Sequence, residues 1–373
     1  MKEIYLDSAS TTPVSKEVIK EMNNIHLKEY GNASSQHALG EKAEKIVLES
    51  RKKIAQEINS KPYEIIFTSG TTESDNLAFF GLAKKHKTKR KILISSIEHS
   101  SIFEICDALS KEGYEIIEIP VDSKGFVDLG FIEKNVDKST LIVSVIHANN
   151  EIGVVQDLEK IGKICKLKNV YFHSDCAQSF GKIKIDVKRD NISLLSAGAH
   201  KLNGPKGIGF LYLHSGIEIE PLIYGGGQER GLRGGTENVA SIAGFAKSIE
   251  ICHKLDGKKI KKLRDYFILE LEKIDGKING DRHKRLDNNI SVSFSGIDGE
   301  SLTAFLSHKG IYVSSGSACD SKKKNESRVL RAIGLDANYR KGTIRISLNR
   351  DISKKEIDFV VREIKQIVGK LRM

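Results

Sequence analysis

Short apolar runs alternate with helical patterns along the first two thirds of the chain. Short runs of strand-forming residues lie at 64–68, 91–96, 140–147, 170–175, 192–197 and 207–213. Helical patterns follow the first three runs and begin near Thr72, Ser101 and Leu158. Continuous apolar strands separated by helices are typical of a mainly parallel sheet that helices cover on both faces. The pattern therefore predicts a doubly wound α/β domain, in which ligands bind at loops beyond the carboxyl ends of the strands.

The pattern changes after about residue 255. A helical segment rich in Lys and Glu spans 258–274. Shorter strands and helices follow it at 288–296, 299–308, 311–317 and 343–349, before a closing helix. The segment 4–7 can add a strand to this second unit or clasp it. We therefore expect a large domain over 13–255 and a smaller α+β domain made of 1–12 and 256–373.

Composition places the chain among ordinary globular proteins. Of its 373 residues, 39% are hydrophobic and 29% are charged, which excludes a disordered or fibrous chain. The net charge is +11, but the lysines are spread over the whole sequence, so we expect solvated faces and no direct nucleic-acid binding. The sequence has neither a run of about 18 apolar residues nor an apolar signal segment at its start. We therefore expect no membrane contact and a cytoplasmic location.

The five cysteines are Cys106, Cys165, Cys176, Cys252 and Cys319. Their count is odd and no CxxC pair occurs, so neither a disulfide framework nor a metal site is expected. Cys319 stands apart, because it lies between a Gly/Ser turn and three lysines in the stretch SSGSACDSKKKNESR. An exposed and electropositive setting favours the thiolate, which makes Cys319 the candidate nucleophile. Cys165 lies in an amphipathic helical pattern and is expected in the core.

Two charged residues follow predicted buried strands. Lys201 precedes a Gly/Pro-rich turn in SAGAHKLNGPKGIGF, and Asp175 ends the strand of HSDCAQS. Partial burial lowers the pKa of a lysine and makes it nucleophilic, as Schiff-base chemistry requires. A pyridinium nitrogen of pyridoxal phosphate (PLP) needs an acidic partner, which Asp175 can supply. Alternatively, Lys201 forms an ion pair and Asp175 caps a helix. Neither residue alone indicates a cofactor site, whereas the two together do.

A third pattern, TSGTTESDN, runs from a strand into a helix at Thr71 and Thr72. Free backbone N–H groups at a helix start favour a phosphate, and the threonine hydroxyls add donors. An ordinary capping box is the alternative. Neither a Walker A pattern nor a complete GxGxxG is present, so nucleotide binding has little support.

Polar residues at other predicted loops complete the candidate site. His99, in EHSS, can stack on a cofactor ring or move protons, although a lone histidine is more often structural. Asn149 and Gln178 can donate hydrogen bonds to cofactor oxygens. Thr236 lies in the glycine-dense loop GGGQERGLRGGTEN, which suits an anion at a subunit boundary or is an ordinary surface loop. Arg345, on a predicted strand, needs an anionic partner such as a substrate carboxylate.

Together these motifs resemble the NifS/IscS-type cysteine desulfurases, class V enzymes of the aminotransferase-like, fold-type-I PLP group. The resemblance covers nearly the whole chain, from YLDSASTT to RISLNRD. Its most specific stretches are TSGTTESDN, HANNEIGVVQD, HSDCAQSFGKIKID, AHKLNGPKGIGFLY, GGGQERGLRGGTEN and SSGSACDS. It implies a large PLP-binding domain with a mainly parallel, seven-stranded sheet and a smaller α+β domain that carries the cysteine loop. It also implies a homodimer.

The resemblance assigns roles residue by residue. Lys201 would bind PLP covalently, Asp175 would pair with the pyridine nitrogen, and His99 would stack on the ring and take part in acid/base steps. Cys319 would accept sulfur from L-cysteine as a persulfide, and Arg345 would hold the substrate carboxylate. The remaining matches to cofactor or substrate contacts are Thr71, Thr72, Asn149, Gln178, His200 and, from the neighbouring subunit, Thr236.

This chain departs from the family pattern at several positions. Gly198 stands three residues before the lysine, where a phosphate-binding serine is common. The loop after Cys319 is more basic than usual and lacks the usual proline, which leaves open whether an iron–sulfur scaffold or a tRNA-thiolation enzyme accepts the sulfur. A selenocysteine lyase, another class V enzyme, or a sulfur-carrier scaffold with a degraded site are the alternative functions.

Overall fold

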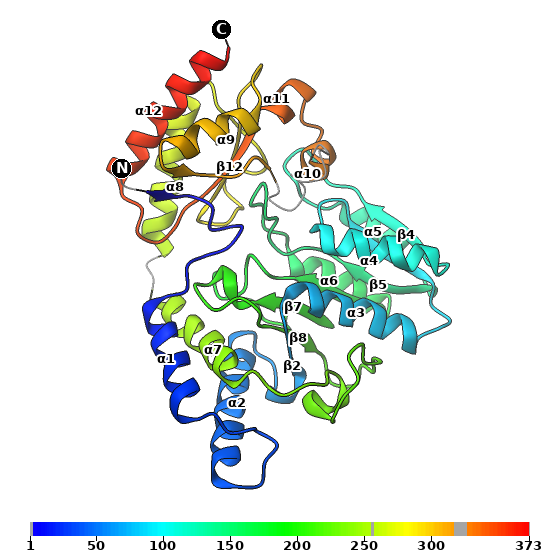
Figure 1. Ribbon diagram of the computed structural model, residues 1–373. Helices are drawn as coiled ribbons and strands as arrows, with labels where there is room; N and C mark the ends of the chain where they lie inside the picture. Colours follow the sequence, from blue (N-terminus) through cyan, green and yellow to red (C-terminus); the bar gives the residue numbers. More distant parts are fainter. Residues whose placement is uncertain (1–2, 255–256, 317–326, 373) are drawn as a thin grey trace.

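The computed structural model describes residues 3–254, 257–316 and 327–372 (Figure 1). Its largest sheet has seven strands in the order β2-β8-β7-β6-β5-β3-β4. The strands are β2 (Ile65–Thr68), β3 (Lys91–Ser95), β4 (Glu115–Ile119), β5 (Thr140–Ser144), β6 (Tyr171–Asp175), β7 (Leu194–Gly198) and β8 (Gly209–Leu213). Strands β3 to β7 run parallel, whereas β8 is antiparallel to both of its neighbours. The predicted α/β fold with a mainly parallel sheet is confirmed.

Helices cover both faces of this sheet. The helices of this part of the chain are α1 (Lys16–Lys28), α2 (Ala38–Glu57), α3 (Thr71–Lys85), α4 (Ser100–Lys111), α5 (Leu129–Asn135), α6 (Leu158–Leu167) and α7 (Val239–His253), with short 3-10 turns η1 (Pro62–Glu64), η2 (Ala199–Lys201) and η3 (Gln228–Gly231). Alternate strand residues enter two separate cores, because successive side chains point to opposite faces. Phe172 and Phe210 pack with α2, α6 and α7, whereas Leu194 and Leu211 pack with α3 and α4.

The strand β4 lies at the edge of the sheet and was not among the predicted strands. Its sequence EIIEI is polar at two of five positions, and only Ile119 is fully buried. An edge strand is half-solvated, so it lacks the continuous apolar run that marks the central strands.

A second unit lies above the first in Figure 1 and has its own core. Its strands are β1 (Ile4–Tyr5), β9 (Lys277–Ile278), β10 (Asn289–Ser293), β11 (Ile311–Tyr312) and β12 (Thr343–Ser347), and its helices are α8 (Gly257–Glu272), α9 (Gly299–His308), α10 (Arg328–Ala332), α11 (Ala337–Lys341) and α12 (Lys354–Leu371). Ile4 and Leu6 are buried in this core, and β1 pairs in parallel with β11. The separate core supports the proposed domains 13–255 and 1–12 with 256–373, which remain a proposal.

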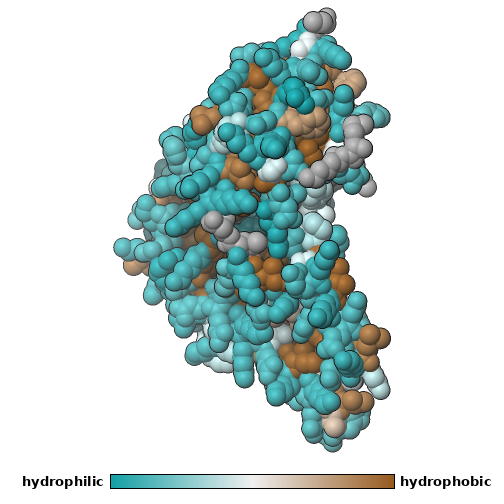
Figure 2. Space-filling view, turned by 90° about the vertical axis from the view of Figure 1, so that its left-hand side faces the viewer, coloured by the Kyte–Doolittle hydropathy of each residue, from teal (hydrophilic) through white to brown (hydrophobic). Residues whose placement is uncertain are grey.

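Polar side chains cover most of the face shown in Figure 2, where apolar residues form scattered patches. Within the described ranges, every helix is too short or too polar to cross a membrane.

Candidate functional site

A cavity of about 520 Å³ opens where β6 and β7 end and where α3 and α4 begin. The expected ligand site of a parallel sheet is this edge, because loops diverge beyond the carboxyl ends of the strands. Eight of the residues proposed from the sequence line it: Thr71, Thr72, His99, Asp175, Gln178, His200, Lys201 and Arg345. The fold thus brings together segments from both units of the chain.

Lys201 ends the turn η2, directly after β7. Its Nζ donates to the carbonyl oxygen of Ser10 at 2.7 Å and to that of Ala9. The N-terminal segment therefore supplies the acceptors of the lysine amine. The YLDSASTT stretch pointed to this segment, but no local pattern of residues places its backbone against Lys201.

Asp175 ends β6 and is 3% exposed. Its Oδ1 accepts a hydrogen bond from the backbone N–H of Ala177 at 2.8 Å. Burial raises the pKa of this carboxyl, and the positive charges of His99 and Lys201 act in the opposite direction. A buried carboxylate that faces two cations can pair with a protonated ring nitrogen.

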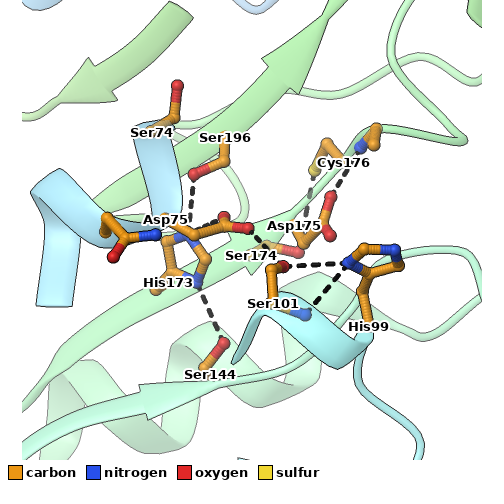
Figure 3. A network of polar contacts seen from close by, with 12 residues as sticks. Ser74, Asp75, His99, Ser101, Ser144, His173, Ser174, Asp175, Cys176 and Ser196 are labelled. Atoms are coloured by element: carbon orange, nitrogen blue, oxygen red, sulfur yellow. Dashed lines mark hydrogen bonds and ion pairs between the residues drawn. The ribbon is translucent and has the colours of Figure 1, made fainter. Parts of the chain in front are cut away.

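His99 caps α4 at its N-terminus and lies on the cavity lining. Its Nδ1 accepts a hydrogen bond from the backbone N–H of Ser101 at 3.2 Å. The Oγ of Ser101 lies 2.9 Å from the same ring nitrogen (Figure 3). The cap fixes the ring, so His99 combines a structural contact with a position at the cavity.

Thr71 begins α3, and its Oγ1 is buried without a hydrogen-bond partner in the described part of the chain. The cap residue Gly70 has no side chain with which to bond the free N–H groups of the first turn. A buried hydroxyl without a partner beside free N–H groups suits an anionic ligand, such as a phosphate.

The departure at Gly198 has a steric explanation. A Cβ atom on Gly198 would lie 3.0 Å from Thr71 Oγ1, which is closer than an ordinary contact. Gly198 therefore leaves space for the hydroxyl of Thr71. A serine at this position and a threonine at position 71 would compete for the same volume.

His200 contributes a neutral ring to this region. Its Nδ1 lies 3.2 Å from the Oγ1 of Thr11. Burial and the neighbouring lysines lower the pKa of His200 to about 4, so the ring is uncharged near neutral pH. It can contact a phosphate through a hydrogen bond and not through a formal charge.

Arg345 reaches the cavity from β12, in the smaller unit. Its Nη2 donates to Asp7 Oδ1 at 2.8 Å and to Ser10 Oγ at 2.6 Å, and Nη1 donates to the Asn150 carbonyl at 3.3 Å. Its Nε is buried and has no hydrogen-bond partner among the described residues. A guanidinium with a remaining N–H can bind a carboxylate.

Three of the other proposed residues, Asn149, Gly198 and Thr236, are not on the cavity lining. The Asn149 side chain is used within its own loop: it donates to the Ile97 carbonyl at 2.8 Å and accepts from two backbone N–H groups. The next residue, Asn150, lines the cavity instead. The motif therefore predicted the correct loop, but we had assigned the contact to Asn149. Gly198 and the exposed Thr236 are not on the lining, and Cys319 lies outside the described residues.

Glu98 is a further buried carboxyl near the site. Its Oε1 accepts from Ile146 N at 2.7 Å and Ser95 Oγ at 3.0 Å, whereas Oε2 has no hydrogen-bond partner among the described residues. Burial, with a smaller effect from Asp175, raises the pKa of Glu98 from 4.5 to about 8. The folded protein therefore retains a proton here that the unfolded chain has lost between those two pH values.

Replacing Glu98 with glutamine is expected to reduce the loss of stability at alkaline pH. The contribution of Glu98 is fully present below its unfolded pKa of 4.5 and is lost as the pH rises through about 8. The E98Q side chain stays neutral throughout. Melting temperatures between pH 5 and pH 9 should therefore fall more steeply for the wild-type protein, with a difference of several degrees by pH ~8. Parallel curves for the two proteins would contradict the assignment.

The model of the class V aminotransferase family matches residues 4–360. The chain is 44% identical to the cysteine desulfurase IscS of Dictyoglomus turgidum, over 100% of this chain and 96% of the relative. It belongs to the class V aminotransferases, within the cysteine desulfurases. The predicted family and activity are thereby confirmed, and the cysteine desulfurases are PLP-dependent through their class.

Solved structures of similar proteins agree with this family. A NifS-like protein has a TM-score of 0.93 and 38% identity, over 99% of this chain and 100% of that one. SspA in complex with cysteine has a TM-score of 0.85 and 35% identity, over 94% of this chain and 99% of that one. The cysteine desulfurase fold therefore extends over essentially the whole chain.

Proposed function

We propose that this cysteine desulfurase uses PLP attached to Lys201 and moves sulfur from L-cysteine to Cys319, with release of L-alanine. The observation that supports it best is the meeting of Lys201, Asp175, His99 and Arg345 at one cavity. The similar SspA forms a complex with cysteine, which favours this amino acid as the substrate. The degraded-scaffold alternative has no support in a cavity that retains all four residues.

The residues of the cavity fit PLP. Lys201 would hold the aldehyde carbon, Asp175 would face the pyridine nitrogen, and the start of α3 with Thr71 would hold the phosphate. When bound, PLP supplies an electron sink that stabilises negative charge at the substrate Cα. The Thr71 hydroxyl, which has no hydrogen-bond partner among the described residues, is the observation that best supports an anionic ligand here.

The protein's own residues would bind the substrate and move protons. Arg345 would hold the substrate carboxylate through N–H groups that Asp7 and Ser10 now share. The Lys201 amine, or the His99 ring, would take the Cα proton and return a proton to the product. Asn150, which lines the cavity, replaces Asn149 as the proposed polar contact of this loop.

Sulfur transfer would require the thiolate of Cys319. The thiolate attacks the substrate sulfur, and a new S–S bond forms while the Cβ–S bond breaks and leaves its electron pair on the substrate. Protonation at Cβ then gives alanine. No external oxidant is needed, because the carbon is reduced as the sulfur is oxidised to the persulfide level.

The decisive experiment measures both products. Protein loaded with PLP is mixed with L-cysteine without a reductant, alanine is quantified, and the protein is analysed by peptide mass spectrometry. We expect one persulfide sulfur on Cys319 for each alanine in the first turnover. Alanine formed while the Cys319 peptide stays unmodified would contradict the assignment. A parallel assay with selenocysteine as the substrate distinguishes a cysteine desulfurase from a selenocysteine lyase.

The Thr71 and Gly198 pair gives a second test, directed at the cofactor. Thr71→Ala removes one charge-assisted hydrogen bond to the phosphate, so PLP affinity should fall by about ten-fold or more. Adding Gly198→Ser to this variant restores a hydroxyl at the vacated volume and should recover most of the affinity. Absorbance titration of the cofactor-free protein measures both constants. If the double variant bound PLP as weakly as Thr71→Ala alone, the proposal that a hydroxyl at position 198 can replace that of Thr71 would be contradicted.

The acceptors of the sulfur are proposed to be an iron–sulfur scaffold protein or a tRNA-thiolation enzyme, in the cytoplasm. We also propose a homodimer, in which the exposed Thr236 of one protomer contacts the phosphate in its partner. Capture of bound proteins by the Cys319→Ser variant, followed by sulfur transfer to each isolated candidate, tests the acceptor. Sedimentation of the purified protein tests the dimer.

A further inference from the structure

A chain of hydrogen bonds leads from the cavity into the protein interior (Figure 3). His99 Nδ1 lies 2.9 Å from Ser101 Oγ, and Ser101 Oγ donates to Asp75 Oδ2 at 3.0 Å. Asp75 lies on α3 and is fully buried. Two helices therefore connect a ring on the cavity lining to a carboxyl group with no access to solvent.

The contacts determine which atoms hold protons. Since Nδ1 of His99 accepts a backbone N–H from Ser101 at 3.2 Å, a neutral ring has its proton on Nε2. Ser101 has a single hydroxyl proton, which can be donated to Asp75 or to His99 at one time. If Asp75 is itself protonated, its O–H can donate to Ser101, and Ser101 can donate to His99. The same heavy-atom positions thus accommodate both arrangements.

The surroundings of Asp75 favour the protonated acid. Burial raises the pKa of Asp75 well above its usual range, and the negative charge of Asp175 raises it further. His173 Nε2 lies 3.6 Å from Asp75 Oδ1, but burial lowers the pKa of His173 to about 3, so this ring is neutral. Glu98 is an acid and supplies no positive charge to Asp75. The positive charge of His99, by contrast, lowers the pKa of Asp75. Ionisation of Asp75 is therefore favoured when His99 is a cation.

We propose that Asp75 and Ser101 form a proton relay that serves His99. A proton moves from the Asp75 carboxyl to Ser101 Oγ while the hydroxyl proton of Ser101 moves to His99 Nδ1. The products are a carboxylate and an imidazolium, and only O–H and N–H bonds change. His99 then gives its Nε2 proton to the reacting molecule in the cavity without taking one from bulk water.

The relay returns to its starting state by the same path. When His99 next accepts a proton at Nε2, the proton on Nδ1 passes back through Ser101 to Asp75. Asp75 and Ser101 act through His99 and are therefore positioning residues. The catalytic use of the relay rests on the proposed function, in which His99 moves protons, but the relay itself is a property of the protein without substrate.

The first experiment follows the ring of His99 by nuclear magnetic resonance in protein labelled with ¹⁵N-histidine, without cofactor or substrate. A His99→Gln sample identifies the signal, and the titration runs from pH 5 to pH 9. Asp75→Asn keeps the shape of the side chain but cannot ionise, and Ser101→Ala cuts the path at a half-buried position. The matched control is Ser110→Ala, an exposed serine of the same helix.

We expect the midpoint of the His99 titration to move to lower pH by about one unit in both path variants, because the imidazolium loses a carboxylate partner. Ser110→Ala should leave it unchanged, and Ser101→Thr, which keeps the hydroxyl, should restore it. A folded Ser101→Ala protein with the wild-type midpoint would overturn the relay. If Asp75→Asn does not fold, Ser101→Ala alone decides.

The second experiment measures kcat and KM for cysteine against pH with the PLP-loaded enzyme. Asp75→Asn and Ser101→Ala should lower kcat by about ten-fold on the alkaline side, where water supplies protons poorly, with KM unchanged. An unaltered kcat profile would overturn the catalytic use of the relay. Failure of the proposed function would be recognised separately, because the titration of His99 requires no turnover.

Discussion

Replacing Lys201 with alanine is expected to abolish desulfurase activity and the covalent attachment of PLP. The residue would serve as both the attachment point and a proton carrier, and the proton-transfer role alone contributes about 10²–10⁴-fold to rate. Its Nζ is directed into the cavity by two backbone carbonyls of the N-terminal segment. Borohydride treatment of the wild-type protein should fix PLP to the peptide that contains Lys201, and the variant should give no such adduct.

A matched control for Lys201→Ala is Lys166→Ala, on the exposed side of α6. It removes the same side chain far from the cavity lining, and we expect wild-type activity and cofactor content. Noncovalent PLP bound by the Lys201→Ala protein is compatible with the assignment, because Asp175 and the start of α3 remain. A borohydride-stable adduct on the variant would refute the role of Lys201.

Replacing Cys319 with serine is expected to reduce persulfide formation and sulfide release to background, while PLP binding is retained. Serine keeps the size of the side chain but is a poor nucleophile toward sulfur, since the thiolate is the reactive form. Cys252→Ser is a suitable control, because burial raises the pKa of the Cys252 thiol and its Sγ contacts the Gly181 carbonyl at 3.1 Å. Steady-state sulfide release with a reductant and mass spectrometry without one distinguish turnover from sulfur transfer.

The outcome for Cys319→Ser separates two parts of the proposal. Loss of persulfide with normal cofactor absorbance would place the defect at sulfur transfer. Undiminished sulfide release and persulfide transfer would refute the role of Cys319. Loss of both the cofactor and the activity would indicate a folding defect, which the melting temperature would reveal.

The fold was predictable to the extent that its strands are fully buried. β5 and β8 have continuous apolar stretches because helices cover both faces of the sheet, and the sequence shows them directly. The edge strand β4 is partly solvated and has two glutamates, so its pattern is weaker. The pattern of apolar residues reflects burial, so it predicts a strand less well where the strand is only partly buried.

The site was predictable as a set of loops more than as a set of side chains. Lys201 and Asp175 reach the cavity because each lies at the end of a central strand, a position that the pattern identifies. Asn149 and Asn150 differ only in the direction of one side chain in a tight turn, which the motif HANNEIG does not encode. Gly198 leaves space for the Thr71 side chain, although the two residues are far apart in the sequence. A local sequence pattern cannot predict such a contact.

The N-terminal segment has a consequence for the order in which the site can assemble. The backbone N–H of Ser8 donates to the Ser347 carbonyl at 3.3 Å, and that of Ala9 donates to the Ser347 hydroxyl at 2.8 Å. The carbonyls next to these groups are the ones that receive the amine of Lys201. The segment that contains Ser8 and Ala9 therefore reaches its final position only after β12, which follows it by more than 300 residues in the sequence, has been made. A nascent chain without β12 lacks a finished cavity, so acquisition of the cofactor is expected to follow the synthesis of β12.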